Sequence, residues 1–113
     1  MDAFTQDGSS LVCNLSAMSA EQRIRHEEVI RQFFAEAIQE TRELPDGLAF
    51  RSNSANLMLA AEFISLERLC CTFFNFSLTI EAASPAFWLS VRGPAGVKTL
   101  LQGGFGSVLK PDA

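Results

Sequence analysis

The chain has 113 residues, 48% of them hydrophobic, and its ten phenylalanines argue against a disordered protein. That length is enough for one hydrophobic core and too short for two domains. Its net charge of −4 argues against nucleic-acid binding as the main role, and no apolar run reaches the roughly 18 residues of a membrane span, so we expect neither nucleic acid nor a membrane as partner.

The N-terminal residues and the number of cysteines predict the cellular location of the protein. Residues 1–9 are polar and small, without a basic start or an apolar stretch, so we expect a mobile tail and no signal peptide. Three cysteines, an odd number in a chain without an export signal, indicate reduced thiols and a cytoplasmic location. We expect one domain at residues 10–103 and a second tail at residues 104–113.

The first half of the chain predicts two short strands and a helix. Alternating apolar residues predict a strand at residues 11–15. A capping box at Ser19 begins a helix, and apolar residues recur every three or four positions from there to about Arg42. A turn at residues 44–47 leads into a strand at residues 48–51.

The second half predicts a buried helix, a hairpin and a short helix. Residues 55–71 are apolar almost all round, which is typical of a deeply buried helix. Residues 74–82 alternate between apolar and polar, and residues 87–91 continue that pattern on a returning strand. The sequence from Gly93 to Gly103 predicts a last, short helix.

These elements predict the fold class and one strand register. A pairing of Ala82 with Phe87 keeps the apolar residues of the hairpin on one face. The order strand, helix, strand, helix, hairpin, short helix favours a two-layer α+β domain. In it the helices pack on one face of a small mixed or antiparallel sheet.

One carboxylate breaks the pattern of the second helix. Glu67 lies in the middle of its apolar side, with Phe63 and Ile64 one turn before it and Cys70 and Cys71 one turn after it. A carboxylate in an apolar setting needs hydrogen bonds, a cation, a metal or a proton. This arrangement makes Glu67 a candidate functional residue.

The first interpretation is a metal site at the end of this helix. Glu67, Cys70 and Cys71 would be ligands, and Cys13 would join them if its strand lies beside the end of the helix. Thiolates prefer thiophilic ions such as zinc, copper(I) or heavier metals and metalloids, and a carboxylate can complete the set. The spacing matches no established zinc signature, and adjacent cysteines within a helix are poorly placed to bridge each other.

The second interpretation is that the chain has no chemical site. Unpaired cysteines are commonly buried as small hydrophobic residues, and Glu67 would then pair with an arginine such as Arg92 or Arg51. The chain would be an interaction module. Trp88, which the alternation places on the outer face of the hairpin, would mark a homodimer or partner surface.

The third interpretation is a thiol redox protein. It requires a lowered pKa at Cys70 or Cys71, but Glu67 beside them would raise it, so this interpretation is the weakest. Two other features have ordinary explanations. His26 has no partner at a local spacing, which predicts a half-buried helix residue, and residues 93–98 predict helix capping rather than an anion site.

Residues 67–73, Glu-Arg-Leu-Cys-Cys-Thr-Phe, resemble a motif of a group of small bacterial proteins. In that group a Glu-Arg-x-Cys-Cys-Pro-Phe run precedes an alternating strand and a Gly-Pro-x-Gly-x-Lys segment, which here is Gly93–Lys98. The resemblance covers residues 11–101, and Thr72 departs from it where the group has proline. It implies a cytoplasmic bacterial protein and no particular activity.

Overall fold

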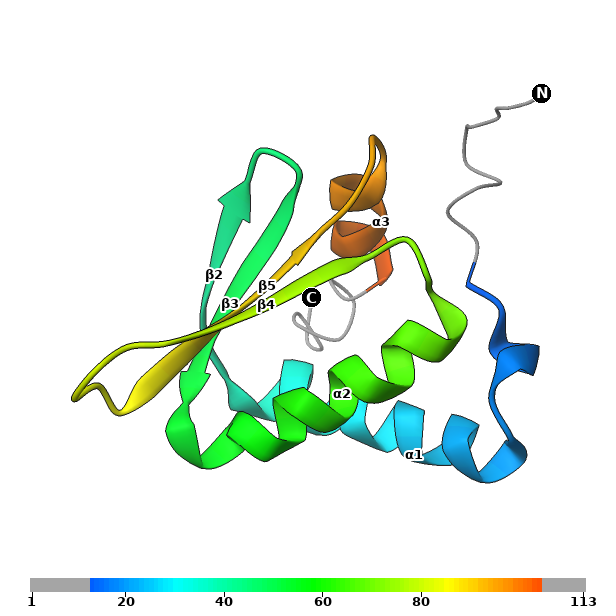
Figure 1. Ribbon diagram of the computed structural model, residues 1–113, viewed down its shortest axis with the longest axis horizontal. Coiled ribbons are helices and arrows are strands. Elements are labelled where there is room, and N and C mark those ends of the chain that lie inside the picture. Colours follow the sequence, from blue (N-terminus) through cyan, green and yellow to red (C-terminus); the bar gives the residue numbers. More distant parts are fainter. Residues whose placement is uncertain (1–12, 105–113) are drawn as a thin grey trace.

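A four-stranded antiparallel sheet and the helices that pack on it make up the computed structural model, which describes residues 13–104 (Figure 1). The predicted α+β class is therefore confirmed. The predicted tail at residues 1–9 lies outside the described residues, and so does the predicted tail at residues 104–113 except for Gly104, which is the last residue of the final helix. None of the described helices is long and apolar enough to cross a membrane.

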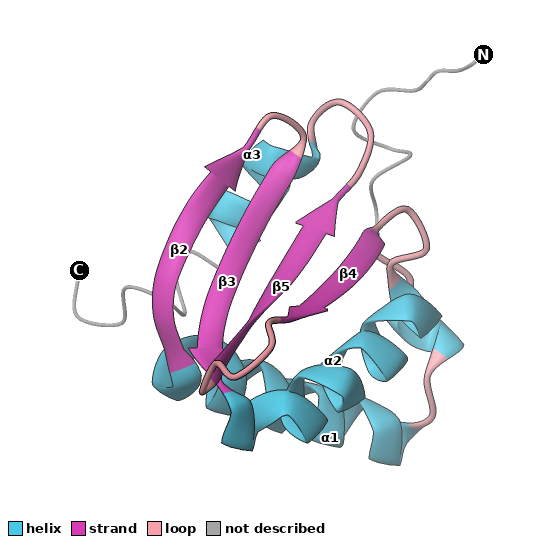
Figure 2. Ribbon diagram, turned by 60° about the vertical axis from the view of Figure 1, so that its left-hand side comes forward, coloured by secondary structure: helices cyan, strands magenta, loops and turns pink. Residues whose placement is uncertain are grey.

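The strands lie in the order β2-β3-β5-β4. The helices and strands, in chain order, are η2 (Leu15–Ala17, a 3-10 helix), α1 (Ala20–Ile30), η3 (Arg31–Ala37, a π-helix), β2 (Ile38–Leu44), β3 (Gly47–Asn53), η4 (Ser54–Asn56, a 3-10 helix), α2 (Leu57–Cys70), β4 (Asn75–Ile80), β5 (Ala86–Arg92) and α3 (Val97–Gly104). Figure 2 shows β2 and β4 on the two edges of the sheet.

The capping box predicted at the start of the first helix is present. The Ser19 hydroxyl accepts a hydrogen bond from the amide of Gln22 at 3.1 Å, and the Ser19 amide donates to the Gln22 side chain at 2.8 Å. Two amides that have no partner inside the helix are satisfied in this way. The cap fixes where α1 begins and hence which of its residues face α2.

Two predictions for the first half of the chain are wrong. The first helix does not reach Arg42: it ends at Ala37, and β2 follows and pairs with β3 through a tight turn after Leu44. The exposed, polar residues 39–43 fit either structure, and the pairing with β3 decides between them. The described part of the predicted strand at residues 11–15 is irregular and then enters a 3-10 helix.

The hairpin of β4 and β5 forms as predicted, but with a different register. Phe87 lies opposite Ile80 instead of Ala82. The connection therefore spans residues 81–85, and Ala83 within it adopts a positive φ of 58°. A shift of two residues leaves every side chain on its predicted face, which explains why the alternation alone could not exclude it.

Phenylalanines form the centre of the core between the helices and the sheet. The Phe34 ring lies 4.9 Å from that of Phe50 on β3 and 5.0 Å from that of Phe63 on α2, both edge to face. Such pairs add stability to the burial of the rings. This packing joins η3, which carries Phe34, to both α2 and β3.

Candidate thiol and carboxylate site

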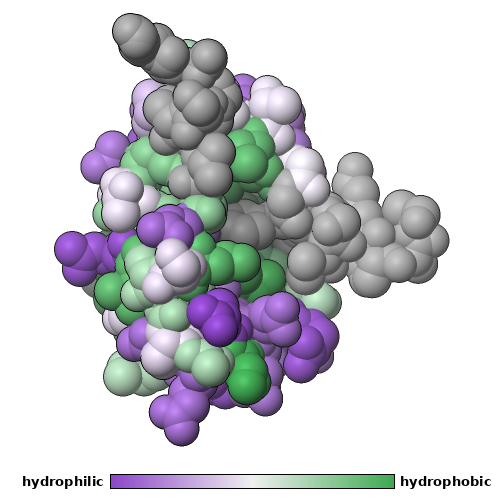
Figure 3. Space-filling model, turned by 90° about the vertical axis from the view of Figure 1, so that its right-hand side faces the viewer, coloured by the Kyte–Doolittle hydropathy of each residue, from purple (hydrophilic) through white to green (hydrophobic). Residues whose placement is uncertain are grey.

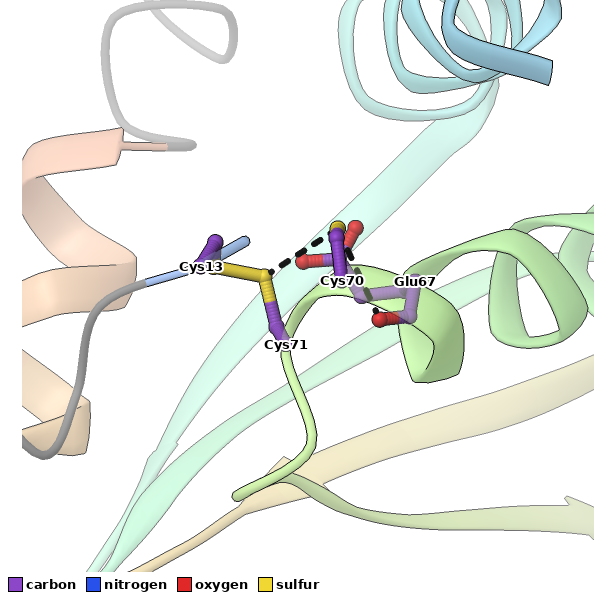
Figure 4. A group of neighbouring side chains, drawn as sticks. All are labelled: Cys13, Glu67, Cys70 and Cys71. Atoms are coloured by element: carbon purple, nitrogen blue, oxygen red, sulfur yellow. Dashed lines mark hydrogen bonds between the residues drawn. A yellow bond between two sulfur atoms is a disulfide. The ribbon is translucent and has the colours of Figure 1, made fainter. Parts of the chain in front are cut away.

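The last turn of α2 gathers three of the predicted site residues. Glu67, Cys70 and Cys71 are spaced three and four residues apart, which places them on the same side of a helix. Their exposed fractions are 3%, 2% and 2%. The expectation that Glu67 is buried beside the sulfurs of Cys70 and Cys71 is therefore confirmed (Figure 4).

Cys13 joins this group from another segment of the chain. The amide of Asn14 donates to the carbonyl oxygen of Cys70 at 2.7 Å, and this contact holds the segment against the end of α2. Cys13 and Cys71 form a disulfide (Figure 4). The expectation of three reduced thiols is therefore wrong for this pair, because folding brings together two cysteines that are 58 residues apart in sequence.

The ligand atoms of the four residues lie close together. One donor atom each from Cys13, Glu67, Cys70 and Cys71 lies within 4.8 Å of the other three. The Sγ atoms of Cys70 and Cys71 are 3.5 Å apart and are not joined by a disulfide, as expected for adjacent cysteines at a helix end. The Cys70 thiol also donates to the backbone oxygen of Glu67 at 3.7 Å.

The partner of Glu67 is a residue that the sequence analysis set aside. Nε2 of His26, on α1, lies 2.5 Å from Oε1 of Glu67, and the exposed fraction of His26 is 8%. The predicted arginine partners are engaged elsewhere: Arg92 pairs with Asp46 at 3.1 Å and Arg51 donates to Gln39 at 2.8 Å. The alternative in which Glu67 pairs with one of these arginines is therefore wrong.

A second polar contact, at the surface, joins the same two helices. Nε of Arg25 lies 2.7 Å from the carboxylate of Glu62, which lowers the pKa of that carboxyl group. This pair is half-exposed, whereas the pair of His26 and Glu67 is buried. The buried pair therefore carries the larger consequence for stability, because water cannot replace either partner there.

The surroundings of Cys70 favour its neutral thiol. Burial, and after it the negative charge of Glu67, raise the pKa of Cys70 from its ordinary 9.0 to about 11. A thiol with such a pKa is a poor nucleophile near neutral pH. Cys70 therefore suits coordination by an ion that can displace its proton better than it suits catalysis of thiol exchange.

This shift predicts a measurable titration in the oxidised protein, where Cys70 is the one free cysteine. Thiolate absorbance should rise with a midpoint near pH 11, and Cys70→Ser should abolish the rise. The folded state holds the proton more tightly, so stability should fall as the pH rises from 9.0 to about 11. A midpoint at or below 9.0 would contradict the buried, acid-flanked setting.

A surface cavity of about 430 Å³ lies beside His26. It is lined by residues of η2 and α1, namely Leu15, Ala20, Arg23, Ile24, His26 and Glu27. Figure 3 views this end of the molecule, where hydrophobic residues lie among hydrophilic ones. His26 both lines this cavity and bonds to Glu67, so it connects the cavity to the buried carboxylate.

The two remaining sequence candidates lie away from this site. Trp88 is half-buried on the outer face of the sheet as predicted, and the guanidinium of Arg42 lies 4.3 Å from its ring centroid. A homodimer through this face stays a prediction. Near the start of α3, Lys98 pairs with Glu43 at 3.2 Å and the amide of Val97 donates to Pro94, which is ordinary turn and capping geometry.

Comparisons with known proteins do not identify a relative of this chain. Family models, curated proteins and solved structures gave no significant match. The resemblance of residues 67–73 to a bacterial motif therefore stays a prediction. The assignment of the site depends on the chemistry of its own side chains.

Proposed function

We propose that this chain, in its reduced state, binds a thiophilic metal or metalloid ion through Cys13, Cys70, Cys71 and Glu67. The observation that carries the proposal is the convergence of four donor atoms within 4.8 Å in a buried site built from two segments. Exposed acidic groups are common without an ion, whereas here three cysteine sulfurs lie beside a carboxylate that is 3% exposed.

The spacing of the donors supports coordination of a single ion. With metal–sulfur bonds of about 2.3 Å, two sulfurs of a tetrahedral site lie about 3.8 Å apart. The Sγ atoms of Cys70 and Cys71 are 3.5 Å apart, so they are close to that spacing before any ion enters. Reduction of the disulfide frees the sulfurs of Cys13 and Cys71 to move apart to the same spacing, so that all three sulfurs can close around zinc or a heavier ion.

The type of donor selects the class of ion. Three thiolates and a carboxylate carry four negative charges, and the thiolates, which form the majority of the set, are soft donors that favour zinc, cadmium, mercury or copper(I) over magnesium or calcium. The high pKa of Cys70 means that the ion must displace its proton, which again favours ions with strong thiolate affinity. His26 would orient the carboxylate of Glu67 through their hydrogen bond, as the hydrogen-bond partners of metal ligands commonly do.

The disulfide makes this binding dependent on reduction. A disulfide between Cys13 and Cys71 leaves only Cys70 and Glu67 as full donors. A dithiol reductant would transfer two electrons and two protons, so that it becomes a disulfide while Cys13 and Cys71 become two thiols. We therefore expect the oxidised chain to bind metal weakly and the reduced chain to bind it tightly.

A cadmium titration tests the proposal. The reduced protein should develop thiolate-to-metal charge-transfer absorbance that saturates at one ion per chain. The oxidised protein and a Cys70→Ser/Cys71→Ser variant, titrated in parallel, should give little of it. Equal binding by the variant and the reduced wild type would overturn the assignment, provided that circular dichroism shows both to be folded.

A thiol redox protein is the second candidate, since a disulfide lies beside a free thiol. The Sγ of Cys70 is 3.5 Å from that of Cys71, within reach for exchange. The raised pKa of Cys70 argues against it as the attacking group. Rapid disulfide exchange with a small thiol near neutral pH, together with no cadmium binding by the reduced protein, would favour this candidate.

A further inference from the structure

The two edges of the sheet differ in charge. β2, on one edge, carries Glu40, Arg42 and Glu43 within seven residues. β4, on the other edge, carries no charged residue, and none occurs anywhere from Thr72 to Ile80. Charged side chains on an edge strand are a common device against pairing with another chain. Only β2 has that protection.

The free side of β4 offers both backbone groups and apolar surface. Among the described residues, β4 pairs with β5 alone, so the hydrogen-bonding groups along its other side face outward (Figure 2). Ile80 is 59% exposed, while Phe76 and Leu78 on the same face are half-buried. An edge with these properties is a template for a further strand.

We propose that the free side of β4 pairs antiparallel with β4 of a second copy of the chain, which extends the two sheets into one. An antiparallel pair of identical strands has a two-fold axis, and here we place it at Leu78. In that register Phe76 lies opposite Ile80 of the second copy, and Ser77 lies opposite Thr79 of the second copy.

The distribution of side chains selects this register. Residues directly opposite each other in an antiparallel pair point to the same face. With the axis at Leu78, apolar residues meet on the inner face and hydroxyl groups meet on the outer face, and the exposed Ile80 becomes covered. An axis at Ser77 would place Ile80 opposite Phe74 of the second copy, a residue that precedes the first residue of β4. The occupant is a second copy because the strand is complementary to itself.

Charge substitutions on the outer face test both the pairing and its register. Sedimentation velocity should give the wild type a mass of twice 12.4 kDa, in reducing as well as non-reducing buffer. Ser77→Lys/Thr79→Lys places lysines opposite each other across the two-fold axis and should give monomers. Ser77→Lys/Thr79→Glu places a lysine opposite a glutamate and should restore the dimer.

Three outcomes would overturn the proposal. A wild type that is monomeric at about 100 µM would have a dimer Kd well above that concentration, which excludes stable pairing through this edge. A dimer that survives the two lysines but is lost in Trp88→Ser places the interface on the outer face of the sheet. Failure of the lysine–glutamate variant to dimerise, with a far-ultraviolet spectrum like that of the wild type, excludes the proposed register.

Discussion

His26→Leu is expected to lower the free energy of unfolding by about 3–5 kcal/mol, as is typical when a substitution leaves a buried charged group without its partner. The carboxylate of Glu67 is 3% exposed, and Nε2 of His26 is the side-chain partner that satisfies it. Leucine would leave this carboxylate without its hydrogen bond in a place that water barely reaches. Denaturant unfolding of the oxidised protein, followed by far-ultraviolet circular dichroism, measures the loss.

The double variant His26→Leu/Glu67→Leu distinguishes the contribution of the contact between the two side chains from the effect of replacing a residue at either position. Removal of both partners leaves no buried charge, so the double variant should be clearly more stable than His26→Leu alone. Glu62→Gln, which breaks the half-exposed contact with Arg25 between the same helices, should cost much less than His26→Leu. A single variant no less stable than the double variant would show that His26 does not stabilise the carboxylate.

The second large effect is on metal affinity. Loss of a residue that only hydrogen-bonds to a metal ligand typically lowers metal affinity by about 10–100-fold. Because Cys70 would be a ligand itself, Cys70→Ser should weaken cadmium binding by the reduced protein by about 100-fold or more. A serine hydroxyl is a hard donor that stays protonated, whereas cadmium prefers a thiolate. Competition with a chelator of known affinity measures the change.

The matched control for this substitution is the oxidised protein. Cys70→Ser retains the disulfide of Cys13 with Cys71, so the variant should fold as the wild type does under oxidising conditions. Its loss of affinity can then be assigned to the missing sulfur and not to unfolding. If cadmium affinity fell less than tenfold, Cys70 would be a core residue and the ligand set would be wrong.

Local spacing is what made part of the site predictable. Glu67, Cys70 and Cys71 occupy one helical turn, and the period of α2 alone places them on the buried side. Cys13 and His26 come from other segments, 58 and 41 residues from their partners. Sequence periodicity carries no information about such distances. In the sequence, the one indication of this partner was a histidine, His26, beside the apolar face of the first helix. Its pairing with Glu67 follows only from the packing of α1 against α2.

The sheet shows the same division between local and tertiary information. The alternating pattern predicted β4 and β5 and their inner faces correctly, because it reports which side of a strand is buried. It missed β2, whose polar residues continue a helical pattern and become a strand only by pairing with β3. Strand pairing is set by the whole fold and overrides weak local preference.

X-ray absorption at the metal edge of the reduced, cadmium-loaded protein tests the central claim most directly, because it reports the atoms bound to the ion. The proposed ligand set predicts three sulfur neighbours together with oxygen from a carboxylate. In Cys70→Ser one of the sulfurs should be missing. A shell of oxygen and nitrogen alone around the ion in the wild type would contradict the account.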